Sequence, residues 1–239
     1  MPKRGWIYEK GDIHGEWMKK IEEGKIGREW YLLVFRKKMK FITDFLDKQK
    51  GKKILDAGCG EGILVEKYRN KGYDIEGIDP NYESEFVKPV SILKTDYKDD
   101  TFDIVLLLDV LEHISYSDQY IALKEIKRIL KSDGLLIMSV PNLANLTSRI
   151  KFFLFGKLSR GDKDYNHIGE RPFPEYKSLL ELQNFKIEKI YGITITIPIL
   201  WQIVTVFPEK LQLVHDFLLN FANIPHISLL NIFIARNIK

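Results

Sequence analysis

The residues best suited to chemistry lie in a glycine-rich segment, ILDAGCGEG, at positions 54–62. An apolar stretch runs into Asp56, and glycines follow at positions 58, 60 and 62. Glycines at a turn between a strand and a helix permit positive φ angles and a close approach of the backbone to a ligand. The helix that follows presents free amide groups. The segment therefore predicts a loop for a nucleotide-like ligand, and a tight turn without a ligand is the alternative.

Asp79 strengthens the ligand interpretation. It ends the stretch IEGID, 17 residues after Gly62, where a carboxylate can accept hydrogen bonds from ribose hydroxyls. Dinucleotide-binding folds have a similar acidic strand end, but their glycines follow the pattern GxGxxG, whereas those here follow GxGxG. Glu61 would also be unfavourable beside a diphosphate. The spacing thus argues against a dinucleotide.

The elements that position these residues alternate in type. Short apolar stretches predict five strands, at 53–57, 73–78, 90–94, 102–108 and 134–140, with helices at 62–70 and 118–131. Alternating strands and helices indicate a parallel sheet with right-handed crossovers. The carboxyl ends of its strands then lie along one edge, where ligands bind.

The segments outside this alternating region add further helices, strands and insertions. We expect an N-terminal arm and an amphipathic helix within residues 1–50, followed by one domain at 51–239 with substrate-side insertions at about 141–173 and 198–225. Residues 141–173 are rich in loop signals. The other expected elements are helices at 174–183 and 209–220, a sixth strand at 186–195 and a last strand at 227–235.

Composition excludes several classes of protein. The chain has 239 residues, of which 45% are hydrophobic and 29% charged, as in globular proteins with a core. The net charge is only +4, and nine of the 37 basic residues are arginine, so no nucleic-acid partner is expected. Cys59 is the only cysteine, which excludes an internal disulfide and a cysteine-based zinc site. A cytoplasmic location fits best.

Residues 190–208 form a run of 19 positions without a charge. This length approaches that of a membrane-spanning helix. However, isoleucine and threonine alternate at positions 193–197, and Pro198 and Pro208 divide the run. Such alternation is typical of a strand. No membrane span is expected.

The DAGCGEG loop, Asp79 and two later segments together resemble class I S-adenosylmethionine-dependent methyltransferases. The later segments are FDIVLLLDVLEHI at 102–114 and LKSDGLLIMSVPN at 130–142, and they are similar to O-methyltransferases of ubiquinone biosynthesis and of glycans. The resemblance covers residues 52–140. It implies an α/β, Rossmann-like fold with a seven-stranded, mostly parallel sheet, helices on both faces and an antiparallel last strand, to which this chain adds an N-terminal helix and an apolar cap.

The resemblance implies S-adenosylmethionine as cofactor and S-adenosylhomocysteine as product. Gly58 and Gly60 would bring backbone under the methionine portion, Asp79 would hold the ribose, and Asp96 would accept a hydrogen bond from the adenine amino group. The full set of implied cofactor-binding residues is Asp56, Gly58, Cys59, Gly60, Asp79, Pro80, Asp96, Tyr97, Leu108 and Asp109.

Methyl transfer from a sulfonium depends mainly on positioning, and no metal is needed to activate the cofactor. A hydroxyl acceptor does require a general base, most often histidine. His113 follows the fourth strand, and His167 lies in the loop after the fifth. Both are candidate catalytic residues, and a structural role for each is the alternative. In some relatives the pair matched by Glu112 and His113 takes part in metal binding or polar networks.

The two insertions are apolar and basic. The segment IKFFLFGK at 150–157 places aromatic residues between lysines, a composition suited to anionic lipid. One hypothesis is a cap for a small or lipid-linked acceptor, with peripheral membrane contact. The alternative is packing into the core or into a homodimer interface.

Three functions compete. The leading one is methyl transfer to a small or lipid-linked acceptor, most readily to a hydroxyl oxygen. The second is a cofactor-binding protein without methylating activity that regulates or scaffolds a partner. The third, a nucleic-acid or protein methylase, is disfavoured by the scarcity of arginine and by LLLDVLEH at 106–113, where amino-group methylases carry an Asn-Pro-Pro-aromatic motif. The acceptor, the choice of histidine, the oligomeric state and the role of the arm stay open.

Overall fold

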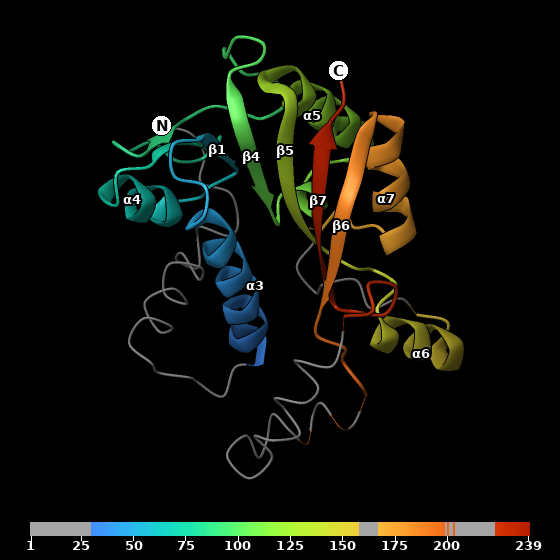
Figure 1. The fold of residues 1–239 in the computed structure, drawn as a ribbon. Coiled ribbons are helices and arrows are strands. Elements are labelled where there is room, and N and C mark those ends of the chain that lie inside the picture. The colour runs from blue at the N-terminus through green and yellow to red at the C-terminus, as the bar shows by residue number, and fades with distance from the viewer. Residues whose placement is uncertain (1–29, 158–166, 199, 201–202, 204–222) are drawn as a thin grey trace.

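The chain forms one seven-stranded mixed sheet covered by helices on both faces (Figure 1). The computed structural model describes residues 30–157, 167–198, 200, 203 and 223–239. The strand order is β3-β2-β1-β4-β5-β7-β6. The strands are β1 (Lys53–Ala57), β2 (Asp74–Ile78), β3 (Val87–Lys88), β4 (Phe102–Leu108), β5 (Leu130–Pro141), β6 (Phe185–Ile193) and β7 (Leu230–Asn237).

Strand direction confirms the expected Rossmann-like topology. The first five strands run parallel, whereas β7 pairs antiparallel with both β5 and β6. The order reverses between β1 and β4, because the chain winds outward in both directions from this pair. In such sheets ligands bind at the carboxyl ends of the two strands that flank the reversal.

Two hydrophobic cores lie on opposite faces of the sheet. One packs the strands against α5 (Tyr116–Ile129) and α7 (Phe173–Leu182). The other packs them against α3 (Trp30–Leu46) and α4 (Ile63–Asn70). Successive residues of one strand enter different cores, as Val105 and Leu106 do, because side chains alternate across a strand. Burial on both faces accounts for the continuous apolar sequence of β4.

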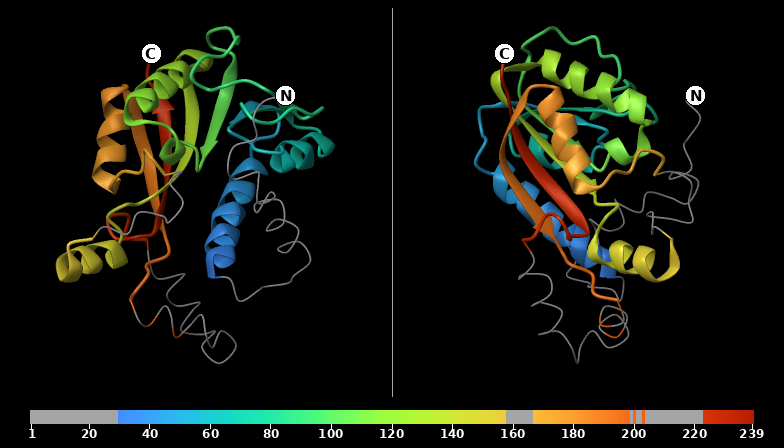
Figure 2. Two further views of the ribbon diagram at one scale, coloured as in Figure 1. Left: turned by 180° about the vertical axis from the view of Figure 1, so that it is seen from behind. Right: turned by 90° about the vertical axis from the view of Figure 1, so that its right-hand side faces the viewer.

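Helices α3 and α6 (Leu146–Phe155) extend beyond the carboxyl ends of the parallel strands, and α6 lies apart from the helices that cover the sheet (Figures 1 and 2). The Asn145 side chain caps α6 by accepting a hydrogen bond from the Ser148 amide at 3.1 Å. Gly156, with φ 64°, ends the helix. The expectation of a loop-rich segment at 141–173 is therefore wrong over the length of α6.

The predicted third strand at 90–94 is also wrong. The strand is β3, which ends at Lys88. Pro89 follows and has no amide hydrogen for a sheet. Ser91 then forms a local turn, in which its hydroxyl accepts from the Leu93 amide at 3.2 Å and its carbonyl from the Lys94 amide at 3.2 Å. A local side-chain turn thus competes successfully with strand pairing.

The sixth strand, expected at 186–195, is β6 and ends at Ile193. The alternating threonine and isoleucine residues at 194–197 lie beyond this strand, so their interpretation as a strand is wrong. Thr194 has φ 59°, a left-handed conformation that interrupts the extended backbone. The described part of the chain contains no helix long and apolar enough to cross a membrane. The expected N-terminal arm and the helical pattern at 209–220 lie outside the described residues.

Candidate active site

The glycine loop lies at the carboxyl end of β1 and is fastened to β2. The amides of Gly58 and Cys59 donate to the Ile78 carbonyl at 2.7 and 3.1 Å. Gly58 has φ 78°, and a Cβ at this position would lie 2.4 Å from Val110 Cγ2. A side chain there would therefore meet both backbone strain and a steric clash.

Asp79 joins the end of β2 to the glycine loop. One carboxylate oxygen accepts from the Gly60 amide at 3.1 Å, and the other accepts from the Asn81 amide at 2.9 Å. Burial raises the pKa of Asp79, although the two amides favour its charged form. A carboxylate has about four acceptor positions. Asp79 can therefore order the loop and still accept from two ligand hydroxyls.

Asp56 is buried inside the sheet, one residue before the end of β1. Burial raises the pKa of its carboxyl to about 7, and the nearby charge of Asp79 adds to this effect while Lys38 opposes it. The carboxyl groups of Asp56, in β1, and Asp79, just after β2, thus lie near each other under the glycine loop. One of them is partly protonated at neutral pH because both charges together are unfavourable in a buried place.

Cys59 packs between the loop and β2. A Cβ on Gly77 would lie 2.8 Å from the Cys59 sulfur, which shows how closely the thiol fills this space. Burial is the largest cause that raises the pKa of the thiol. A protonated thiol is a poor nucleophile, so the contribution of Cys59 here is packing.

The other predicted cofactor residues differ in environment. Asp96 and Pro80 are exposed. The Tyr97 hydroxyl donates to Glu76 at 3.1 Å, and its ring packs edge-on against Phe102 at 4.8 Å. The side chain of Tyr97 therefore holds its segment against the sheet, which leaves its backbone, and not its ring, for a ligand.

Asp109, at the end of β4, is held from two sides. It adopts φ 55°, a left-handed conformation that is uncommon outside glycine and often found at functional sites. Its amide donates to the Ser139 carbonyl at 3.0 Å, and its carboxylate accepts from the Ser139 hydroxyl at 2.5 Å. The second carboxylate oxygen pairs with Lys38 of α3.

Sequence reasoning missed Lys38, which lies beside the candidate site. It is only 3% exposed, and its ammonium lies with Asp109 at the carboxyl edge of the sheet. A signal was present, because position 38 lies one helical turn from the apolar residues Val34 and Ile42 on the buried face of the helix. A charged residue on such a face needs a partner.

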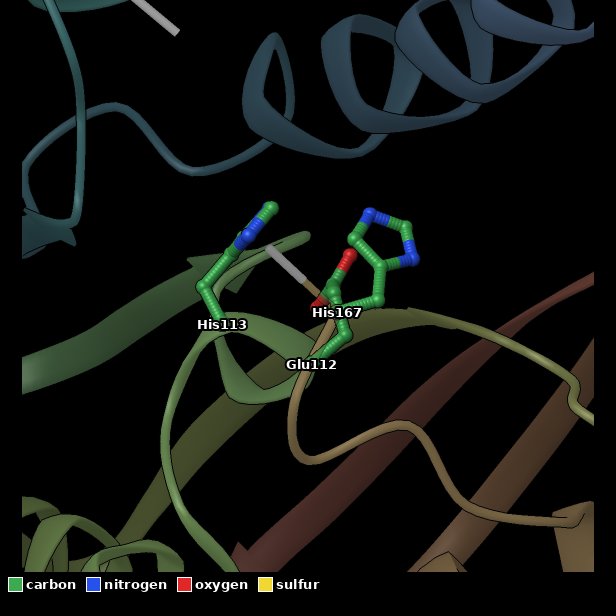
Figure 3. Close-up of side chains that lie close together, drawn as sticks. All are labelled: Glu112, His113 and His167. Carbon is green, nitrogen blue, oxygen red and sulfur yellow. The ribbon is translucent and has the colours of Figure 1, made fainter. Parts of the chain in front are cut away.

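Glu112, His113 and His167 lie close together (Figure 3), and the charges of Asp109 and Lys38 act on the Glu112 carboxyl. Glu112 and His113 belong to the short helix η1 (Leu111–His113) after β4. The rings of His113 and His167 lie 4.8 Å apart at 84°. The fold thus brings together both histidines that were predicted to be catalytic.

Gly169 and Gln119 hold the segment of His167 against η1. The Gly169 amide donates to the Glu112 carbonyl at 2.9 Å, and a Cβ on Gly169 would lie 1.9 Å from the Ile114 carbonyl oxygen. The buried Gln119 amide group donates to the Gly169 carbonyl at 2.7 Å and to the Leu111 carbonyl at 2.8 Å. Neither residue carried a motif that would have revealed this role.

Similarity to known proteins identifies the domain. A model of the methyltransferase domain family matches residues 31–190, which is more than half of the chain. The chain belongs to this family. It carries a class I S-adenosylmethionine-dependent methyltransferase domain, as the glycine loop and the strand order also indicate.

Curated relatives match over part of their length. An uncharacterised protein of Methanocaldococcus jannaschii is 37% identical over 113 residues, which cover 44% of this chain and 49% of the relative. A ubiquinone biosynthesis O-methyltransferase of Photobacterium profundum is 32% identical over 120 residues, or 44% of this chain and 50% of the relative. The chain spans about half the length of the curated relatives it matches.

Solved structures share the fold at low identity. A methyltransferase of Archaeoglobus fulgidus has a TM-score of 0.57 and 19% identity, covering 87% of this chain and 94% of that one. The 1,6-didemethyltoxoflavin-N1-methyltransferase of Burkholderia thailandensis, solved with S-adenosylhomocysteine, has a TM-score of 0.55 and 15% identity, covering 100% of this chain and 93% of that one.

The residues present fit S-adenosylmethionine, the cofactor of this family. Among the residues that the structure describes, a Cβ on Gly60 would meet only Tyr82 within 4 Å, at 3.8 Å, so these residues leave room beside the loop backbone. Asp79 adjoins that space and retains acceptor positions. The methyltransferase domain therefore has the open loop and the acidic strand end that a cofactor with a ribose needs.

Proposed function

We propose that the protein transfers the methyl group of S-adenosylmethionine to a hydroxyl oxygen of a small or lipid-linked acceptor. The observation that carries this proposal is the pairing of His113 and His167 beside Glu112 at the carboxyl edge of the sheet. A hydroxyl must lose its proton during methylation, and imidazole is the side chain that most often assists such a step near neutral pH.

The cofactor side of the site is assigned to the glycine loop and the ends of β2 and β4. Gly58 and Gly60 lie under the methionine portion, Asp79 receives the ribose hydroxyls, and Asp109 borders the methionine end. Asp56 orients the loop from below, and Pro80, Asp96, Tyr97 and Leu108 border the adenosine and methionine portions. S-Adenosylmethionine supplies a methyl carbon that is activated by the positive charge on its sulfur.

The acceptor side is assigned to His113 and His167. The acceptor's oxygen bonds to the methyl carbon as the carbon–sulfur bond breaks, and the electron pair of that bond stays on sulfur. The proton of the hydroxyl leaves the acceptor's oxygen, and a neutral imidazole of either histidine can receive it. The protein then contributes mainly the alignment of two reactants and the exclusion of water.

The surface of α6 supports a lipid-linked acceptor and peripheral contact of a cytoplasmic protein with a membrane. Four consecutive apolar side chains, Phe152 to Phe155, are exposed, and Phe153 is 87% exposed. Lys151 and Lys157 flank them and are exposed as well. Apolar groups beside cations suit the interface of an anionic bilayer. The helix belongs to the insertion at 141–173, which we assign to the substrate side.

Identification of the product tests the function. Purified protein is incubated with S-adenosylmethionine and a panel of phenols, prenylated phenols and lipid-linked glycans, and products are identified by mass spectrometry and NMR. We expect an O-methyl ether. A methyl group on nitrogen would overturn the assignment of the acceptor atom. Cofactor binding without turnover of any acceptor would favour a regulatory or scaffolding protein instead.

Sedimentation with vesicles tests the lipid contact. We expect binding to vesicles with 30% phosphatidylglycerol, weaker binding to pure phosphatidylcholine, and at least a fivefold loss in Phe153→Ser/Phe155→Ser. The matched control is Leu182→Ser, which removes an exposed apolar side chain from α7 and should bind as the parent does. Equal binding by all three proteins would contradict the assignment of α6.

A further inference from the structure

One nitrogen of the His167 ring is buried beside a carboxyl group. In the part of the chain that the structure describes, its Nδ1 atom is buried and has no hydrogen-bond partner. The Oε2 atom of Glu170 lies 3.7 Å from this nitrogen. The separation exceeds a hydrogen bond of about 3.0 Å, but contacts between catalytic groups are often long until a ligand binds. A small shift of either side chain closes the gap.

Contacts with α5 fix the backbone around Glu170. The Tyr116 hydroxyl donates to the Glu170 carbonyl at 2.9 Å. The Gln119 amide group donates to the carbonyl of Gly169 at 2.7 Å, and its oxygen accepts from Arg171 Nε at 2.6 Å. Only 3% of Glu170 is exposed. The fold therefore buries this carboxyl group beside the imidazole and leaves it little freedom to move.

Glu112, the other buried carboxyl group of this cluster, differs from Glu170 in charge. Burial raises the pKa of Glu112 well above its usual range, and the charges of Asp109 and Glu170 add to this effect while Lys38 opposes it. Glu112 is therefore neutral near pH 7. Glu170 is then the carboxylate placed to offset a positive charge on the His167 ring when the ring accepts a proton.

His113 restricts the ring of His167 from another direction. The two rings meet edge to face, with 4.8 Å between their centroids (Figure 3), a favourable arrangement for aromatic groups. This contact limits rotation of the His167 ring. With Nδ1 directed to Glu170, Nε2 is the nitrogen that remains for an acceptor.

We propose that His167 is the base that receives the acceptor's proton, and that Glu170 is a positioning residue that holds His167 in the tautomer with a free Nε2. The inference rests on the proposed function and chooses between its two histidines. A carboxylate at Nδ1 keeps the ring hydrogen on that nitrogen, so Nε2 has the lone pair that a base needs. It also stabilises the imidazolium that forms, as in other histidine–carboxylate pairs.

The proton then follows a defined path. As the acceptor's oxygen bonds to the methyl carbon, the carbon–sulfur bond breaks and sulfur keeps the electron pair. The hydroxyl proton passes to Nε2 of His167, while Nδ1–H donates to Glu170. The imidazolium releases its proton to solvent after the ether leaves, which restores the neutral ring for the next reaction.

The tautomer of His167 tests the pairing without any acceptor. Long-range proton–nitrogen NMR spectra of protein with ¹⁵N-labelled histidine are recorded at about pH 8, where an ordinary imidazole is neutral, and His167→Gln identifies the signals. We expect the ring hydrogen on Nδ1 in the parent and a shift towards Nε2 in Glu170→Gln. The matched control is Glu175→Gln, which removes an exposed carboxylate that pairs with Arg171 and should keep the parent tautomer.

Two results of these spectra would overturn the role of Glu170. One is a ring hydrogen on Nε2 of His167 in the parent. The other is the same tautomer in the parent, in Glu170→Gln and in Glu175→Gln. The affinity of each variant for S-adenosylmethionine, measured by calorimetry, should equal that of the parent and shows that the variant is folded.

Kinetics distinguishes the two histidines. With the acceptor found by product analysis, kcat and KM are measured for His167→Phe, His113→Phe and Glu170→Gln. We expect kcat to fall about a hundredfold or more in His167→Phe, which loses the base, and at least tenfold in Glu170→Gln, with the KM for S-adenosylmethionine unchanged in both. The loss in His113→Phe should be smaller than in His167→Phe, because phenylalanine keeps the ring contact.

The outcomes separate this inference from the proposed function. A larger loss of kcat in His113→Phe than in His167→Phe, or a parent-like kcat in Glu170→Gln, would overturn the inference and leave O-methyl transfer intact. A ring hydrogen on Nδ1 that depends on Glu170, together with N-methyl products, would support the pairing and overturn the proposed function.

Discussion

Lys38 of α3 and Asp109 at the end of β4 form a buried ion pair between residues that are 71 positions apart. The pair fastens α3 to the edge of the sheet at which the glycine loop and the two histidines lie. Asp109 also accepts from the Ser139 hydroxyl, so the three segments α3, β4 and β5 meet at one carboxylate. Helix α3 is thereby part of the framework of the proposed active site.

Lys38→Met tests this connection. The substitution leaves the Asp109 carboxylate without its cation, and removing one partner of a buried pair typically costs about 3 to 5 kcal/mol. We expect a fall of this order in the free energy of unfolding, measured by urea denaturation at pH 7. Lys40→Met is the control, because Lys40 pairs with Asp44 on the exposed surface of the same helix and should cost less than about 1 kcal/mol. Equal losses in the two variants would contradict a special role for Lys38.

Asp79→Ala removes the acceptor of the Gly60 amide and the carboxylate that we assign to the ribose. We expect at least a hundredfold weaker binding of S-adenosylmethionine by calorimetry, because the loop loses its anchor and the ligand loses its hydrogen bonds. Asp74→Asn, at the exposed start of the same strand, should leave the affinity unchanged. Parent-like affinity in Asp79→Ala would overturn the assignment of the cofactor site.

The raised pKa of Asp56 predicts that the free energy of unfolding depends on pH. Burial raises the pKa of Asp56 to about 7, so the folded protein retains a proton that the unfolded chain releases at much lower pH. This contribution to stability is complete at acidic pH, below the pKa of the unfolded chain, and is lost as pH rises through about 7. The loss is about 4 kcal/mol for a shift of roughly three pH units.

Comparison with Asp56→Asn isolates this contribution, because asparagine stays neutral at every pH. We expect the variant to gain stability relative to the parent as pH rises from about 4.5 to 8, measured by urea denaturation across this range. Asp74→Asn should show a constant difference from the parent, since Asp74 is exposed. A constant difference for Asp56→Asn would show that Asp56 is charged throughout.

Gly169→Ala should separate the acceptor side of the site from the cofactor side. The added Cβ would lie 1.9 Å from the Ile114 carbonyl oxygen, so the segment carrying His167 must move away from η1. We expect at least a tenfold loss of methyl transfer, while the affinity for S-adenosylmethionine stays unchanged.

Gly72→Ala provides the control for Gly169→Ala. Gly72 has φ 78°, and none of the described residues would lie within 4 Å of the added methyl group, so the substitution should lower stability by about 1 kcal/mol through backbone strain. Its methyl transfer should equal that of the parent. Parent-like activity in Gly169→Ala would show that the position of His167 does not matter for the reaction.

The sequence correctly predicted those strands, turns and helices that depend on residues close together in the chain. The apolar stretch of β4, the glycine turn before α4 and the periodicity of α5 specify their structures directly, because burial on two faces, positive φ and an apolar helix face each leave a mark in the sequence. The prediction of a strand at 90–94 was wrong because Pro89 and the Ser91 turn outweigh the apolar pattern.

By itself, the sequence determined the class of fold and the cofactor, and it predicted the glycine loop and the two histidines as residues to test, since each depends on residue types at short spacing. Only the tertiary structure decided that Lys38 reaches Asp109 and that His167 meets His113 and Glu112. These contacts join segments far apart in the chain. Their formation depends on the packing of α3 against the sheet and on the fit of Gly169 against η1. Neither contact can be predicted from the propensities of neighbouring residues.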